Sequence, residues 1–426
     1  MTTWHRMNRI NGKTTGFFHQ KPTRCLVAVS LAALLVAGGC KRSATDKPAP
    51  AKLDAAVAAS VSDEEARQWA DQMADILQRS DVDALGQMID LVDMFEKGAQ
   101  GVALPANHRE AFLQGVRDVA KSASRQWAHM GREGTINVLR VYRDGGQVMA
   151  LLRNILHDHT VNYMEFPLAK MPDGAVVATD CLSFIAGQTL GELAKSMAVQ
   201  VQASIADNKA TPEVQAILAL QKPLEKMRQG DLAGALQLLD ALPDSQKNSQ
   251  HGLHLRLIVT GQIPEAHTDG RYMKMLETFR EYLPDNPSAD LYGMEYFFLK
   301  GDYSAVEQCV DNLDKLVGGD PYLTVIRSRC ARLSGNPDRA YALALQATQA
   351  EPDLIHGHYA LLNAANDQND FPTVAATLTT LVNTFDVDVE EILNNHDELS
   401  AFLNSPEGAR WLIDRGLTPD NDGDDE

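Results

Sequence analysis

The spacing of apolar residues changes near positions 131 and 206, and it predicts two kinds of folded structure. From 62 to about 130, apolar residues recur every three or four positions, as in amphipathic helices. Ser62 and Glu65 have the spacing of a capping box, so a first helix begins there and places Trp69 and Met73 on its apolar face. A second helix is expected over 81–97 and a third from 107 to 130.

After Gly131 the pattern alternates with a period of two, which is typical of strands. Four strands are expected at 136–142, 147–156, 161–170 and 175–185, joined by short turns such as Asp144-Gly145-Gly146. Residues 62–205 therefore predict an α+β domain in which helices pack on an antiparallel four-stranded meander. In element order this domain resembles the NTF2-like and cystatin-like rolls, which often enclose a pocket.

From 206 to 415 the pattern is helical throughout, and short turns recur at Gly230, Gly261, Gly301, Gly335 and Asn369. The last three turns are each 34 residues apart, whereas the longer interval before Gly301 indicates an insertion near 266–271. A 34-residue unit of helix, tight Gly-Asp or Asn turn and helix resembles the tetratricopeptide repeat, or TPR. The alternatives are an unrelated α-solenoid and a bent helical bundle.

The TPR resemblance implies a concave groove, lined by the first helix of each unit, that binds peptides or partner proteins. Aligning the units on their turns places seven residues on this groove: Glu295, Phe298, Arg329, Arg332, Tyr359, Asn363 and Asn366. Two arginines among asparagines and aromatic residues suit a peptide carboxylate or backbone amides. Alternatively, the arginines pair with Glu295 or neighbouring acids on a solvated face.

Two cysteines, Cys309 and Cys330, fall in the second helix of one unit and the first helix of the next. Because these helices pack together in TPR proteins, the resemblance allows a disulfide between them in an oxidising compartment. The alternative is two independent buried thiols.

The N-terminus has a basic leader and then an uncharged apolar run over 25–39, the order found in signal peptides. This run ends in Leu34-Leu35-Val36-Ala37-Gly38-Gly39-Cys40, which resembles the lipobox of bacterial lipoproteins. The resemblance implies a signal peptide over 1–39, cleavage before Cys40, and a diacylglycerol and an N-acyl chain on that residue. Lys41 in place of aspartate favours the outer membrane, facing the periplasm, with 40–61 as a flexible tether. An uncleaved anchor and a non-lipidated signal peptide are the alternatives.

The formal net charge of −18 makes nucleic acid an unlikely partner, because an acidic body repels phosphates. Residues 416–426 form an acidic tail. His157 and His159 flank a turn residue and are either metal ligands or, as we prefer, solvated corner residues. The chain contains no G-x-S-x-G, H-E-x-x-H, P-loop or G-x-G-x-x-G motif, and neither cofactor nor metal is expected.

These patterns predict a non-catalytic, lipid-anchored envelope scaffold that binds protein or peptide partners through a TPR-like groove. One alternative is a small-ligand-binding or hydrolytic N-terminal roll mounted on the repeats. Another is a structural lipoprotein whose repeats stack on copies of themselves.

Overall fold

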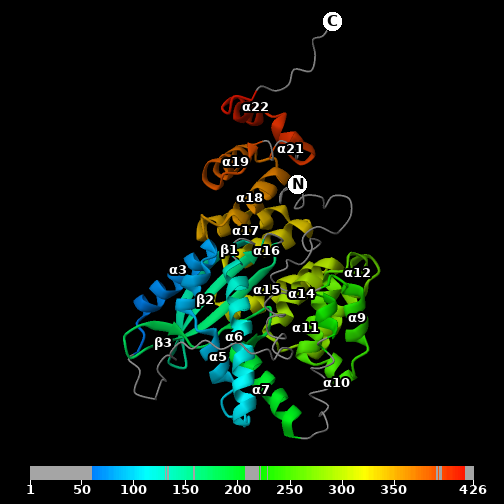
Figure 1. The fold of residues 1–426 in the computed structure, drawn as a ribbon. Coiled ribbons are helices and arrows are strands. Elements are labelled where there is room, and N and C mark those ends of the chain that lie inside the picture. The colour runs from blue at the N-terminus through cyan, green and yellow to red at the C-terminus, as the bar shows by residue number, and fades with distance from the viewer. Residues whose placement is uncertain are drawn as a thin grey trace. The chain divides into compact units, whose positions relative to one another are not determined.

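The computed structural model describes residues 60–417, except 130, 132–133, 157–158, 207–219, 221, 228, 390–391 and 393–395. The expected signal peptide, Cys40, nearly all of the tether, and residues 418–426 of the tail lie outside this range. The described chain divides into two compact units (Figure 1), residues 60–292 and 293–417, here called the N-terminal and C-terminal units.

The N-terminal unit begins with four helices, three of which follow the expected pattern closely. They are α3 (Asp63–Arg79), α4 (Val82–Met88), α5 (Leu91–Gly98) and α6 (Ala106–His129). The predicted capping box is present, since the Ser62 side chain accepts from the Glu65 amide and the Glu65 side chain from the Ser62 amide. The single helix expected over 81–97 is wrong. Ile89 is extended, and Asp90 caps a new helix by accepting from the Asp93 amide.

The sheet of this unit is antiparallel and has six strands, so the expected four-stranded meander is corrected. Its strands are β1 (Gly134–Asp144), β2 (Gln147–Leu156), β3 (Val161–Lys170), β4 (Val176–Ala178), β5 (Leu182–Ser183) and β6 (Gln188–Thr189). The strand predicted over 175–185 is split, because β4 and β5 pair with different parts of β3 on either side of Pro167. Pro167 accepts from the Thr179 amide but has no N–H to return, so the ladder is interrupted there.

The helices lie against one face of the sheet and form the core of the unit. Helix α3 packs on β1 and β2 (Figure 1), and its predicted apolar face is buried. The rings of Trp69 and Trp127 both contact Phe166 of β3. Burying these large rings supplies much of the apolar stabilisation of this face.

The rest of the N-terminal unit is helical. It contains α7 (Leu190–Ala206), α9 (Leu232–Asp240), α10 (Asp244–Lys247), α11 (Gln250–Gly261), α12 (Pro264–Thr268) and α13 (Arg271–Tyr282). Gly261 is the last residue of α11 rather than a turn, and α12 occupies the predicted insertion. Helix α14 (Pro287–Lys300) begins in this unit and ends in the next.

A buried histidine joins the segment after β5 to α11 within this unit. His254 Nδ1 lies 2.9 Å from the Gln250 carbonyl oxygen, and Nε2 lies 3.1 Å from that of Ile185. The Ser288 hydroxyl is 3.4 Å from Nε2, and the ring packs edge-on against Phe279. Burial lowers the pKa of His254 to about 4, so the imidazole is neutral at pH 7.

The C-terminal unit is a run of antiparallel helix pairs. After the end of α14 come α15 (Tyr303–Val317), α16 (Pro321–Leu333), α17 (Pro337–Ala350), α18 (Ile355–Asp367) and α19 (Phe371–Phe385). Helix α16 packs on α17, α17 on α18, and α18 on α19, while α16 also contacts α18. The coarse expectation of an α+β part followed by an all-helical part is therefore confirmed.

One turn recurs three times at the predicted interval of 34 residues. Gly301, Gly335 and Asn369 all have positive φ, at 71°, 75° and 57°. In each case the next residue donates its amide to the carbonyl five positions back, as in a Schellman motif. That same residue (Asp302, Asn336 or Asp370) then caps the following helix with its side chain.

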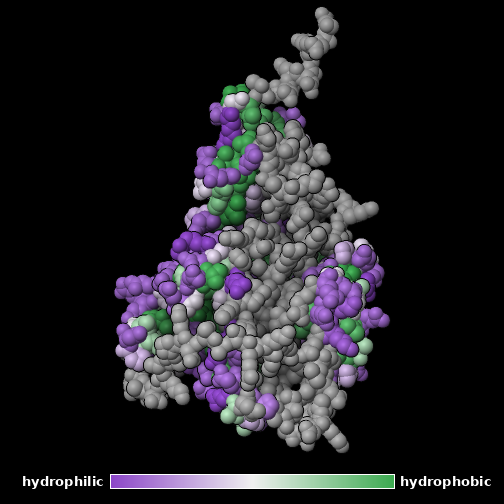
Figure 2. All heavy atoms as spheres, viewed as in Figure 1, coloured by the Kyte–Doolittle hydropathy of each residue, from purple (hydrophilic) through white to green (hydrophobic). Residues whose placement is uncertain are grey.

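Helices α21 (His396–Leu403) and α22 (Pro406–Ile413) pack at the end of the run, as the predicted capping helices should. Phe402 and Trp411 are buried against α19 and its neighbours. Helix α19 contains no charged residue, and Figure 2 shows apolar side chains at the surface in this part of the unit. No helix within the described ranges is both long and apolar enough to cross a bilayer.

Candidate functional site

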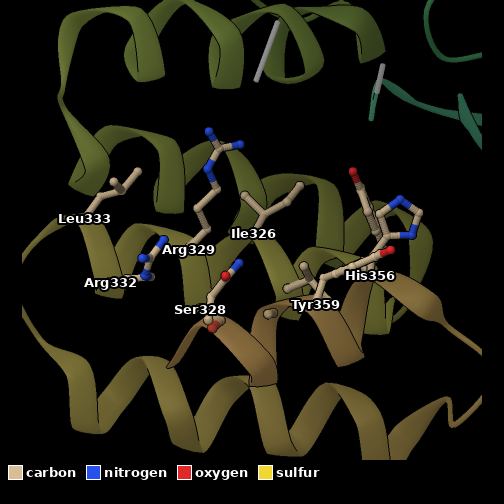
Figure 3. Close-up of a pocket in the computed structure, with 11 residues that line it drawn as sticks. Ile326, Ser328, Arg329, Arg332, Leu333, His356 and Tyr359 are labelled. Carbon is tan, nitrogen blue, oxygen red and sulfur yellow. The ribbon is translucent and has the colours of Figure 1, made fainter. Parts of the chain in front are cut away.

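A pocket lies between α16 and α18, the first helices of two consecutive pairs in the C-terminal unit (Figure 3). Its cavity volume is about 60 Å³, enough for a small functional group with a few carbon atoms. No aspartate or glutamate is among the eleven residues that line it, which are Tyr322, Val325, Ile326, Ser328, Arg329, Arg332, Leu333, His356, Tyr359, Ala360 and Asn363.

The lining residues occupy the same positions of two successive repeats. Tyr322 and His356 are 34 residues apart, and so are Val325 and Tyr359, and Arg329 and Asn363. On each helix they are spaced three or four residues apart, so they lie on one face. The pocket is thus built by the same face of two helices in consecutive units.

Arg329 supplies a cation at one side of this pocket. In Figure 3 it lies with Arg332 and Leu333 on one side, and His356 and Tyr359 lie on the other. The Arg329 guanidinium carbon is 5.0 Å from the ring centroid of Phe298, a cation–π distance. Desolvation lowers the pKa of Arg329 to about 9, which still leaves the group charged at pH 7.

The second cation, Arg332, is held by an acid at the edge of the pocket. Its Nε lies 2.5 Å from Asp367 Oδ2 and its Nη2 lies 3.1 Å from Oδ1, a two-point ion pair between α16 and α18. About 30% of each side chain is exposed, and Asp367 does not line the pocket. This pairing agrees with the alternative interpretation in which the arginines meet acids, although the acid is Asp367.

The remaining polar groups of the pocket are fixed by local contacts. The His356 ring stands edge-on to Tyr322, with 5.1 Å between the centroids. The Ser328 hydroxyl donates a 2.7 Å hydrogen bond to the carbonyl of Ala340, so its proton is committed to α17. Orientation of a ligand therefore depends on the guanidinium groups and on the Tyr359 and Asn363 side chains.

Four of the seven residues predicted for the groove meet in this pocket: Arg329, Arg332, Tyr359 and Asn363. Phe298 lies against Arg329 and supports the site from α14. Glu295 is buried, with 8% of its surface exposed, and Asn366 is half-buried; neither lines the pocket.

Sequence reasoning missed Tyr322 and His356 in the lining and Asp367 at its edge. A signal for the first two was present, because shifting Tyr359 and Asn363 back by one period gives Val325 and Arg329 on the face that carries Tyr322. No equivalent signal identified Asp367 as the partner of Arg332.

Cys309 lies on α15 and Cys330 on α16, as expected, and both are buried thiols with no disulfide between them. Burial raises the pKa of Cys330 to about 12, so it is protonated at pH 7. The structure thus corresponds to the second of the two alternatives, two independent buried thiols.

The histidines that flank the turn after β2 gain no support as metal ligands. His157 lies outside the described residues, and His159 is at the turn with a φ of 66°. Within the described ranges, no three His, Cys, Asp or Glu side chains converge in a way that could hold a metal ion.

Comparison with known proteins places no relative beside this chain. No protein family matches it, and neither a curated protein nor a solved structure is similar to it.

Proposed function

We propose that this protein is a non-catalytic scaffold whose C-terminal unit consists of TPR-like helix pairs and binds a protein or peptide partner. The pocket between α16 and α18 is the recognition site, and it receives an anionic group of that partner. The supporting observation is that Arg329 and Arg332 enter a pocket whose lining includes no carboxylate.

The chemistry of the lining supports a carboxylate with a short apolar neighbour. Guanidinium groups form charge-assisted hydrogen bonds with carboxylates, about twice as strong as neutral ones. The aliphatic side chains of Val325, Ile326 and Ala360 offer apolar contact beside the cations. A chain with a net charge of −18 also repels anions elsewhere on its surface, so a local cationic pocket gives specificity.

The N-terminal sequence supports the membrane part of this proposal. The lipobox-like run ending in Cys40 and the polar segment after it would anchor the scaffold by lipid and hold it away from the bilayer. Lys41 favours the outer membrane, with the scaffold facing the periplasm.

An array of immobilised hexapeptides, each displayed with a free C-terminal carboxylate and as the C-terminal amide, tests the recognition site. We expect the purified protein to bind a subset of free acids and to lose most of that binding on the matched amides. Arg329→Gln should abolish the preference for acids, whereas Arg410→Gln, at an exposed arginine of α22, should keep it. Equal binding to acids and amides would rule out anion recognition.

A further inference from the structure

Arg332 has two competing uses in the structure, because it lines the pocket and at the same time holds Asp367. We propose that Asp367 is a specificity-determining residue of the pocket, one that favours a single carboxylate and disfavours a doubly charged group. This inference rests on the proposed function, since it concerns the anion that the same pocket receives.

The geometry of the ion pair places the acid next to the pocket but outside its lining. Asp367 lies one helical turn after Asn363 on α18, so the two side chains are on the same face. It accepts from both Nε and Nη2 of Arg332, which orients the guanidinium plane along the edge of the pocket. A carboxylate bound near Arg332 therefore approaches the Asp367 carboxylate as well.

The pair is exposed enough to be exchanged. Each side chain keeps about 30% of its surface accessible, and ion pairs screened by solvent are weak. An incoming carboxylate can thus share Arg332 with Asp367 or replace it. The second charge of a dianion would have to lie beside Asp367, and repulsion between like charges a few ångströms apart is strong where water is partly excluded.

Two four-carbon acids, butyrate with one carboxylate and succinate with two, provide matched probes. Binding is followed by NMR titration of the histidine Cε1–H signals of the full chain, with the His356 signal assigned by substitution. Wild type should bind butyrate in preference to succinate. In Asp367→Asn the affinity for both should rise, that for succinate by about tenfold and more than that for butyrate, since the repelling charge is gone.

Three variants separate this role from a structural one. Asp367→Glu keeps the charge and should keep the wild-type preference. Asp338→Asn removes one charge from α17 away from the pocket lining, where the carboxylate accepts from Gln368, and should also keep it. The double exchange Arg332→Asp with Asp367→Arg retains an ion pair but puts the acid into the lining. It should melt like wild type and bind butyrate at least about tenfold more weakly.

The outcomes for the two proposals are distinct. If neither wild type nor Asp367→Asn binds butyrate or succinate, the proposed anion site is wrong, and the role of Asp367 with it. If wild type binds butyrate and Asp367→Asn leaves the ratio of the two affinities unchanged, the anion site holds and the role of Asp367 is overturned. Weaker binding by Asp367→Asn, with a lowered melting temperature, would likewise show that the residue only supports the packing of α16 on α18.

Discussion

The guanidinium of Arg329 lies over the ring of Phe298, 5.0 Å from its centroid. Such a contact contributes about 0.5–2 kcal/mol, with the larger values where water is excluded. It stabilises a positive charge at a position where desolvation lowers the pKa of Arg329 to about 9. Phe298 therefore helps to keep the pocket cationic without adding a negative charge to it.

Replacing Phe298 by leucine tests this contribution. The substitution keeps an apolar side chain of similar length but removes the π-system, so affinity for butyrate should fall by about two- to fivefold. The measurement is the same NMR titration, with the melting temperature as the control for packing. An unchanged affinity in a variant that melts like wild type would show that the ring is not needed for anion binding.

The repeat register was the most predictable feature of the chain. Gly301, Gly335 and Asn369 can be read from the sequence because positive φ favours glycine and asparagine, and their spacing gave the helices on either side. The same spacing brought Arg329 and Asn363 onto one surface. Positions that repeat along a sequence are therefore positions that meet in space when the units stack.

Other features depended on contacts that no local pattern encodes. Pro167 interrupts the sheet only because its missing N–H faces β4 and β5, and this follows from the register of β3. The pairing of Arg332 with Asp367 depends on how close α16 and α18 approach at one end. Several acids of the chain could have filled that role, and only the packing selects one.

The recurring turn predicts a stability contrast at one position. Asn369 has a φ of 57°, a conformation that costs a residue with a Cβ about 1 kcal/mol unless it is asparagine or aspartate. Asn369→Ala should lower the free energy of unfolding by about 1 kcal/mol, whereas Asn369→Gly should leave it nearly unchanged. Gly335→Ala should resemble the alanine variant, since a Cβ there meets no atom within 4 Å and only the backbone is strained. Urea unfolding of the three variants measures the contrast, and equal losses for alanine and glycine at 369 would contradict it.

The environment of His254 predicts a loss of stability in acid. Burial holds its pKa at about 4 in the folded protein, below the unfolded value of about 6.5, so the stabilisation is present above pH 6.5 and is lost as the pH falls toward 4. Between pH 7 and pH 5 the free energy of unfolding should drop by about 2 kcal/mol from this group.

Urea unfolding at the two pH values measures this drop, and His254→Gln should reduce it. His358→Gln, at a histidine that accepts or donates only at the Pro352 carbonyl near the surface, is the matched control and should keep the wild-type dependence. Burial also lowers the pKa of His251 on the same helix, so a smaller dependence remains in the His254 variant. A drop that is the same in His254→Gln and wild type would place the sensitivity elsewhere.

The proposed lipid anchor makes a prediction that is independent of the pocket. If Cys40 carries a diacylglycerol and an N-acyl chain, several acyl chains at about 0.8 kcal/mol per buried methylene hold the protein firmly at a membrane. Cys40→Ala should abolish metabolic labelling with radioactive palmitate, and a variant that is still cleaved should appear in the soluble fraction. Cys25→Ala, within the apolar run, should label and fractionate like wild type, because that residue is removed with the signal peptide. Labelling that persists in Cys40→Ala would exclude this cysteine as the site, whereas a mature soluble variant that still binds free-acid peptides would show that the anchor and the recognition site act separately.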